Sequence, residues 1–273
     1  MSDLTPSLSI PRWGVMWGLA IFIYAISKGL SWTQRSSSSA PVWKHVIYLV
    51  VWPGMDVDPF LSVCNVSHPT LADWIFATFK LGCGMSILLL VVPALAGANR
   101  YLVGWIGMLG IVFALHFGLF HLISNLCRQL GLNAVPIMNW PIASQSLTGF
   151  WGKRWNLAFR DLTYHFLFRP LVRYIGPAGT LMAGFLVSGL VHDLVISIPA
   201  GGGYGLPTCY FLIQGTAIFA ERSQWGRAIG LGQGVRGWLF CLVSVLAPCP
   251  LLFHKSFVCG VIVPFLQVIG LVK

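Results

Sequence analysis

The chain has 273 residues, of which 56% are hydrophobic and only 9% charged, with a formal net charge of +10. A soluble globular domain carries about 25% charged residues, so this composition excludes a soluble protein and predicts a multi-pass, all-α membrane protein. The Lys and Arg residues lie mostly in short segments between apolar runs. We therefore expect them to set orientation and to favour anionic lipid headgroups or an anionic substrate, with no nucleic acid as partner.

The seven cysteines form no CxxC pair and mostly lie in or beside apolar runs, so we expect neither a disulfide framework nor a metal site. At the N-terminus, only Arg12 precedes the first apolar run, and no small-residue cleavage pattern follows it. This pattern favours a retained first helix over 13–30 and not a cleaved signal.

Before residue 100 the sequence predicts two membrane spans, at 13–30 and 74–95, each about as long as the roughly 20 residues that cross a bilayer. The apolar stretch 42–52 is too short to cross alone, and we expect it to be interfacial or re-entrant. The turn-rich PGMDVDP link at 53–59 follows it.

The longest apolar run, 101–126, carries His116 and His121. Five residues turn a helix through about 140°, so these two side chains do not share a face and are a poor metal pair. Further apolar segments follow the cation-rich segment 127–173, at 180–199, 206–220, 237–253 and 256–272.

The positive-inside rule places the basic segments 127–173 and 221–236 in the cytosol, opposite the uncharged turn at 200–205. We expect roughly seven to eight transmembrane helices, plus interfacial or re-entrant helices. The chain is expected to form a single integral-membrane domain over 1–273, without internal repeats.

The segment 180–199 holds His192 and Asp193, an adjacent titratable pair inside an apolar run. An Asp at a helix centre costs roughly 2.5–3.5 kcal/mol on insertion scales, so such groups usually face protein or a water-filled cavity. Gly184, Ser188 and His192 recur every four residues and share one helix face, whereas Asp193 points about 100° away. A small-residue packing face with a satisfied histidine explains this pattern as well as a site does.

The run FWGKRWN at 150–156 places two tryptophans beside two cations and an amide. An amphipathic surface helix accounts for the charges of Lys153, Arg154 and Arg160 through headgroup contacts. The density of Trp151, Lys153, Arg154, Trp155 and Asn156 also fits a site that stacks on a ring or binds phosphates.

The runs FWGKRWN, FRPLVR and FLVSGLVHD, together with VWPGMDVDPF at 51–60, resemble the wax-synthase-like branch of the membrane-bound O-acyltransferase superfamily. The resemblance covers roughly 45–225, which we take as the site-bearing core. In that superfamily an Asn or Asp in an aromatic-basic motif precedes an intramembrane His, and here His192 follows Asn156 by 36 residues. Asp193 stands where the family more often has Glu.

The resemblance implies acyl transfer from acyl-CoA, as co-substrate and without a further cofactor, to the hydroxyl of a lipophilic alcohol. His192 is the expected general base, and Asn156 either bonds the acyl carbonyl or holds His192. The expected substrate-binding residues are Trp151, Lys153, Arg154, Trp155, Ser188 and Asp193.

Two other classes remain open on the sequence. A proton-coupled transporter or channel would use His192 and Asp193 as a relay, although no second mid-span acid accompanies them. A purely structural membrane protein would use Ser188 and Gly189 for helix packing. The sequence does not separate plasma membrane from endoplasmic reticulum.

Overall fold

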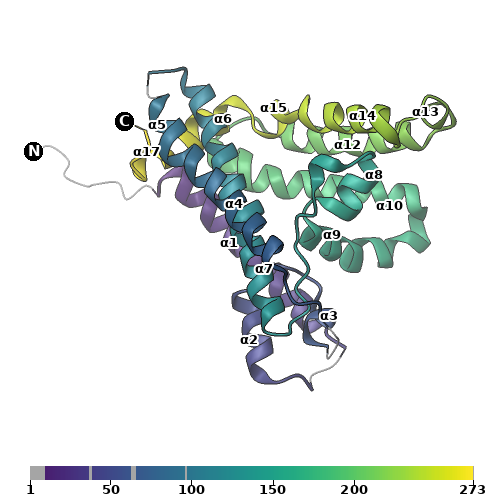
Figure 1. Ribbon diagram of the computed structural model, residues 1–273. Helices are drawn as coiled ribbons and strands as arrows, with labels where there is room; N and C mark the ends of the chain where they lie inside the picture. The colour runs from purple at the N-terminus through teal and green to yellow at the C-terminus, as the bar shows by residue number, and fades with distance from the viewer. Residues whose placement is uncertain (1–9, 37–38, 63–65, 96, 273) are drawn as a thin grey trace, which may run out of the picture.

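The computed structural model describes residues 10–36, 39–62, 66–95 and 97–272, so Cys64 lies outside the described residues. Over these ranges the chain forms helices and no strand, which confirms the all-α class (Figure 1). The first half contains α1 (Arg12–Thr33), α2 (Val42–Val50), α3 (Val57–Leu61), α4 (Leu71–Ser86), α5 (Val92–Ala94), α6 (Arg100–Ile111) and α7 (Phe120–Gln129).

The second half begins with a 3-10 turn at Pro141–Ala143, followed by ten α-helical segments. These are α8 (Leu147–Gly149), α9 (Leu157–Thr163), α10 (Arg169–His192), α11 (Ile198–Ala200), α12 (Leu206–Arg222), α13 (Gln224–Ala228), α14 (Gly234–Leu246), α15 (Cys249–Leu252), α16 (Lys255–Phe257) and α17 (Val263–Val268). Wider π-helical turns join or extend several helices, at Ile87–Val91, Val112–Leu119, Phe150–Arg154, Tyr164–Phe168, Asp193–Ser197 and Val258–Ile262.

Five helical stretches of the described chain are long and apolar enough to cross a membrane: Arg12–Thr33, Leu71–Ala94, Arg100–Gln129, Leu157–Ala200 and Gly234–Leu252. The expected total of seven to eight spans therefore stays a prediction. The stretch at 42–52 forms only the nine-residue α2, which is too short to cross alone.

The stretch Leu157–Ala200 is bent, and the bend shapes the second half of the molecule. Gly176 adopts φ 68°, a left-handed conformation open to glycine at little cost, and Pro177 cannot continue the helical hydrogen bonding. Figure 1 shows α9 leading to this bend at the right-hand end, from which α10 returns alongside α12, and α12 in turn contacts α14.

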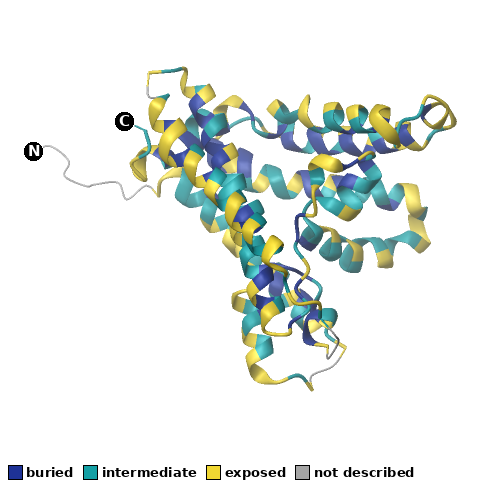
Figure 2. Ribbon diagram, in the orientation of Figure 1, coloured by how far each residue is buried: buried dark blue, intermediate teal, exposed yellow. Residues whose placement is uncertain are grey.

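Two hydrophobic cores hold the fold, seen as the dark blue segments of Figure 2. The larger core joins α1, α6, α10, α12 and the C-terminal helices. The smaller one gathers Tyr48, Trp52 and Phe60 from α2, α3 and their link against α7 and residues 132–138.

Side chains on one face of α1 bind the backbone carbonyls of the link between α2 and α3. Tyr24, Lys28 and Ser31, spaced four and three residues apart, donate to the carbonyls of residues 52, 54 and 55. The PGM part of the 51–60 run therefore takes a structural role, because the buried carbonyls of Gly54 and Met55 find hydrogen-bond donors on α1.

Close packing of α10 on α12 fixes the position of His192. A Cβ atom at Gly189 would lie 2.5 Å from the Cα of Thr208, so only glycine allows this approach. As a result the rings of His192 and Phe211 lie with their centroids 4.5 Å apart.

Candidate active site

A cavity of about 280 Å³ lies between the FWGKRWN segment, α9, α10 and α12. It contains five of the residues expected from the sequence to form a site: Trp151, Trp155, Asn156, Ser188 and His192. The structure thus brings Asn156 and His192, which are 36 positions apart, to the wall of one cavity.

The hydrogen bonding of His192 determines which ring nitrogen carries the proton. Its Nδ1 lies 2.7 Å from the backbone carbonyl oxygen of Ser188. A carbonyl only accepts, so Nδ1–H is the donor and, in the neutral ring, Nε2 keeps a free lone pair. His192 is one of the residues that line the cavity.

Asn156 has an unusual backbone conformation, and within the described chain only the oxygen of its side-chain amide is engaged in a hydrogen bond. It lies at φ 42° directly before α9, and its Oδ1 accepts from the backbone N–H of Phe159 at 3.2 Å, so it caps this helix. Asparagine tolerates the left-handed conformation better than most residues. Because the carbonyl end of the amide caps the helix, the NH₂ group is the end that remains to serve the cavity.

Aromatic rings build the wall around these two groups. Trp155 stacks on Phe150 with a 12° interplanar angle, and Trp151 contacts both Phe185 and Phe211 with centroids 5.8 Å apart. An apolar, aromatic cavity with a few polar atoms is typical of a site for a lipophilic ligand.

Ser188 acts through its backbone. Its hydroxyl donates to the carbonyl of Gly184 at 2.9 Å, one turn back on its own helix. Its carbonyl in turn accepts from His192, so Ser188 orients the imidazole and its hydroxyl is already engaged.

The cations of the FWGKRWN run and of α9 divide into two groups. Arg160 lines the cavity and donates to the carbonyl of Gly152 at 3.0 Å, whereas Lys153 is exposed and outside the lining. Arg154 also lies outside it and donates to the carbonyls of Asn139 and Trp140. Its guanidinium therefore holds the loop before the FWGKRWN run.

Asp193 points away from the cavity. Its carboxylate accepts from the backbone N–H groups of Gly205 and Thr208 and from the hydroxyls of Ser197 and Thr208. These bonds fix the turn that leads into α12. The structure thus places Asp193 as an anchor of the turn rather than at the wall of the cavity.

Two residues at the end of α12 had no signal in the sequence beyond charge. Arg222 lines the cavity and donates from Nε to the Thr148 hydroxyl at 3.1 Å. Glu221 is only 5% exposed and accepts from the backbone N–H groups of Leu147 and Thr148. It satisfies free donors at the start of the helix that carries Trp151, where negative charge is favoured.

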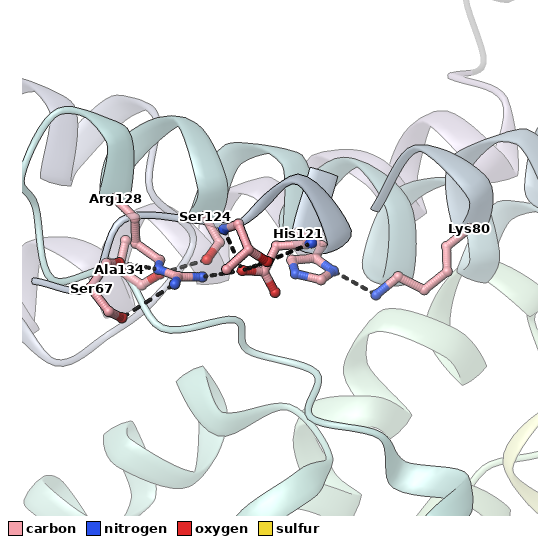
Figure 3. A network of polar contacts seen from close by, with 8 residues as sticks. Ser67, Lys80, His121, Ser124, Arg128 and Ala134 are labelled. Carbon is pink, nitrogen blue, oxygen red and sulfur yellow. Dashed lines mark hydrogen bonds and ion pairs between the residues drawn. The ribbon is translucent and has the colours of Figure 1, made fainter. Parts of the chain in front are cut away.

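The two histidines of the longest apolar run lie outside the lining of this cavity. Figure 3 shows Lys80 of α4 reaching His121 of α7, with Nζ donating to Nδ1 at 2.6 Å. Arg128 bonds the hydroxyl and carbonyl of Ser67 and lies 3.8 Å from Asp73. Among the described side chains, no three His, Cys, Asp or Glu gather as a metal site would require.

Comparison with known proteins points to the same region. The model of the membrane bound O-acyl transferase family matches residues 134–213. A protein of Arabidopsis thaliana named probable long-chain-alcohol O-fatty-acyltransferase 1 is 30% identical over 187 residues, which cover 62% of this chain and 53% of that protein. The long-chain-alcohol O-fatty-acyltransferase of Simmondsia chinensis is 40% identical over 73 residues, 24% of this chain and 21% of its own.

A second Arabidopsis thaliana relative, probable long-chain-alcohol O-fatty-acyltransferase 2, is 32% identical over 135 residues and covers 41% of this chain and 39% of its own. The chain spans about half the length of the first of these relatives and less of the others. No solved structure matches. The family match and the five long apolar helices establish an integral membrane protein.

Proposed function

We propose that this chain is a multi-pass membrane enzyme that esterifies a lipophilic alcohol with acyl-CoA. Its sequence is related to the wax-synthase-like branch of the membrane-bound O-acyltransferases. The observation that carries the proposal is the shared cavity of Asn156 and His192 inside the matched segment 134–213. The relatives, named for long-chain alcohols and fatty acyl groups, support this choice of substrates.

His192 supplies the base. Its Nε2 takes the proton of the alcohol while the alcohol oxygen attacks the thioester carbonyl carbon. The new C–O bond forms as the C–S bond breaks, and the departing thiolate takes the same proton back from Nε2. The products are the ester and free coenzyme A, without a covalent acyl-enzyme.

Asn156 supplies a donor for the developing oxyanion. Its Oδ1 caps α9, so the NH₂ group is the end that bonds the acyl carbonyl. Of the two roles expected for this residue, the capping bond therefore favours the contact with the acyl group over a bond to His192. A single donor of this type contributes about 10²–10³ in rate.

The cations at the cavity serve the coenzyme. Arg160 and Arg222 both line it, and guanidinium groups suit phosphate oxygens geometrically. Lys153, seven positions before Arg160 in the sequence, is exposed and adds positive charge for the phosphates of the coenzyme. In this scheme acyl-CoA is a co-substrate, and neither a metal nor another cofactor takes part.

An acyl transfer assay on the 273-residue chain, reconstituted in lipid vesicles, tests the function. Vesicles receive radiolabelled long-chain acyl-CoA and a long-chain alcohol, and both ester formation and free thiol release are measured. Equal amounts of ester and thiol are expected. A lack of ester with every acyl and alcohol length, together with a His192-dependent proton flux across the vesicles, would replace the enzyme by the transporter alternative.

A further inference from the structure

A second hollow, separate from the active-site cavity, lies along α14 and the segment that precedes it. It has a volume of about 530 Å³ and is lined by Ile229, Leu231, Arg236, Leu239, Phe240 and Val243. None of these residues lines the cavity that holds His192. The hollow is therefore a distinct feature that the acyl transfer reaction does not use.

The hollow has one charged residue at one end, and the rest of its lining is apolar. Arg236, Phe240 and Val243 follow one another at four- and three-residue spacing along α14, so they form a single stripe on the helix. Arg236 lies near the start of α14, on the side that the positive-inside rule places in the cytosol. Its Nη1 donates to the carbonyl of Ile229 at 3.4 Å, which holds the guanidinium over the apolar lining.

Among the residues that the structure describes, Arg236 has no acidic partner. The sequence contains no Asp or Glu after residue 221, and the carboxylate of Glu221 is buried against Leu147 and Thr148. In the described part of the chain, the acids that form ion pairs are Asp73 and Asp161, paired with Arg128 and Arg160. A ligand with a negative group above an apolar chain complements this arrangement.

The apolar course continues beyond Phe240. A neighbouring hollow of about 520 Å³ is also lined by Phe240, together with residues of α12 such as Ile213 and Ala217. These α12 residues lie on the face opposite Ile218 and Arg222, which line the active-site cavity. The two hollows together follow the outer surface of α12 and α14 for several turns.

Neighbouring residues are suited to the headgroup layer of a membrane. In α13, Trp225 is 75% exposed, and Arg227 is exposed beside it. Figure 2 shows this right-hand end of the molecule largely in the colour of exposed residues. Trp and Arg are typical of membrane interfaces, where one side of the residue is apolar and the other is polar.

We propose that the two hollows form one groove along α12 and α14, and that this groove binds an anionic glycerophospholipid. Its phosphate contacts Arg236, and one acyl chain lies along Leu239, Phe240 and Val243. The bound lipid would fix the α13–α14 connection against the end of α12.

Native mass spectrometry of the full chain in neutral detergent tests this proposal. The probes are dioleoyl phosphatidylglycerol and dioleoyl phosphatidylcholine, which share acyl chains and differ in charge. The wild type is expected to retain one phosphatidylglycerol in preference to phosphatidylcholine. Arg236→Gln should weaken that retention about fivefold, the typical effect of one cation near a membrane surface, and Arg236→Lys should weaken it less.

Arg173→Gln is the matched control, because Arg173 is an exposed arginine that contacts the ring of Tyr174 and lies outside the groove. It should leave lipid retention unchanged. Equal weakening by both Gln variants would mean diffuse attraction and would overturn the proposal, as would an unaffected Arg236→Gln. A dimer that Arg236→Gln disperses would show that a second copy covers the groove, and would also overturn it.

Discussion

The imidazole of His192 is held by the backbone carbonyl of Ser188, with Nδ1 and the carbonyl oxygen 2.7 Å apart. This bond joins two residues one helical turn apart and sets the tautomer without any acidic residue. In the proposed mechanism His192 therefore works without an Asp partner of the kind used in Ser-His-Asp triads, which agrees with the position of Asp193 outside the cavity.

Asn156→Asp separates the two functions of this side chain. The carboxylate still accepts from Phe159 and so keeps the cap of α9, but it offers no NH₂ donor and opposes negative charge at the acyl carbonyl. We expect kcat to fall about 10²–10³-fold, with the unfolding temperature nearly unchanged. Asn156→Gly, which tolerates φ 42° but lacks both groups, should lose activity and stability together. Normal kcat in Asn156→Asp would exclude the donor role.

Gly184→Leu tests whether substrate occupies the cavity beside α10. A Cβ atom at Gly184 would meet only Leu167, at an ordinary 3.7 Å, so a larger side chain extends into the open space. We expect kcat/KM to fall at least about tenfold, because one misplaced contact at a site costs this much or more. Gly18→Leu, at an open glycine of α1, is the control and should stay active. Unchanged kinetics in Gly184→Leu would place the substrate elsewhere.

Glu221→Ala tests how α12 positions the FWGKRWN segment. The change leaves the backbone N–H groups of Leu147 and Thr148 without their acceptor, at about 1–3 kcal/mol. Both the unfolding temperature and the transfer rate should fall, and Glu221→Gln, which keeps one acceptor oxygen, should lie between.

Asp58→Ala is the control for Glu221, because the Asp58 carboxylate likewise accepts hydrogen bonds, two of them from Ser36, but lies away from the cavity. It should lower stability with little change in the rate per folded molecule. If both variants reduce the rate equally, Glu221 has no special role in positioning the site.

The network around Asp193 also reaches His254, whose Nε2 lies 3.4 Å from the Ser197 hydroxyl, and it predicts a dependence of stability on pH. Burial lowers the pKa of His254 below its usual value, against an opposing effect of Asp193. The neutral imidazole is thus favoured by folding, so stability is complete above the usual pKa of about 6.5 and declines as the pH falls below it. Thermal unfolding in detergent from pH 7.5 to 5.5 should show this decline, and His254→Gln should flatten it. A wild-type midpoint that rises on acidification would contradict the assignment.

The sequence was informative where physics leaves few options. A membrane-depth pair such as His192–Asp193 must face protein or a cavity, and the density of the FWGKRWN run distinguishes it from a plain amphipathic helix. The all-α class follows from composition because a bilayer admits helices or closed barrels. The pairing of Asn156 with His192 rests mostly on the family resemblance, and both residues line one cavity in the structure.

Contacts between distant segments were beyond sequence reasoning. Glu221 and Thr148 are 73 positions apart, and nothing in a basic loop indicates that its neighbouring acid caps another helix. Arg154 has the composition of a phosphate ligand, yet loop geometry directs it to two backbone carbonyls. The stretch Leu157–Ala200 likewise consists of two helical parts that meet at the bend at Gly176. Hydropathy alone does not show whether such a stretch forms one membrane span or two.

The rate of ester formation by reconstituted His192→Ala protein tests the central claim most directly. The comparison is with wild type and with His68→Ala, since His68 is exposed and outside the cavity. We predict a loss of at least about 10²-fold in kcat for His192→Ala, the lower range for removing a general base, and full activity for His68→Ala. Undiminished ester formation by correctly folded His192→Ala would contradict the assignment of His192 as the base.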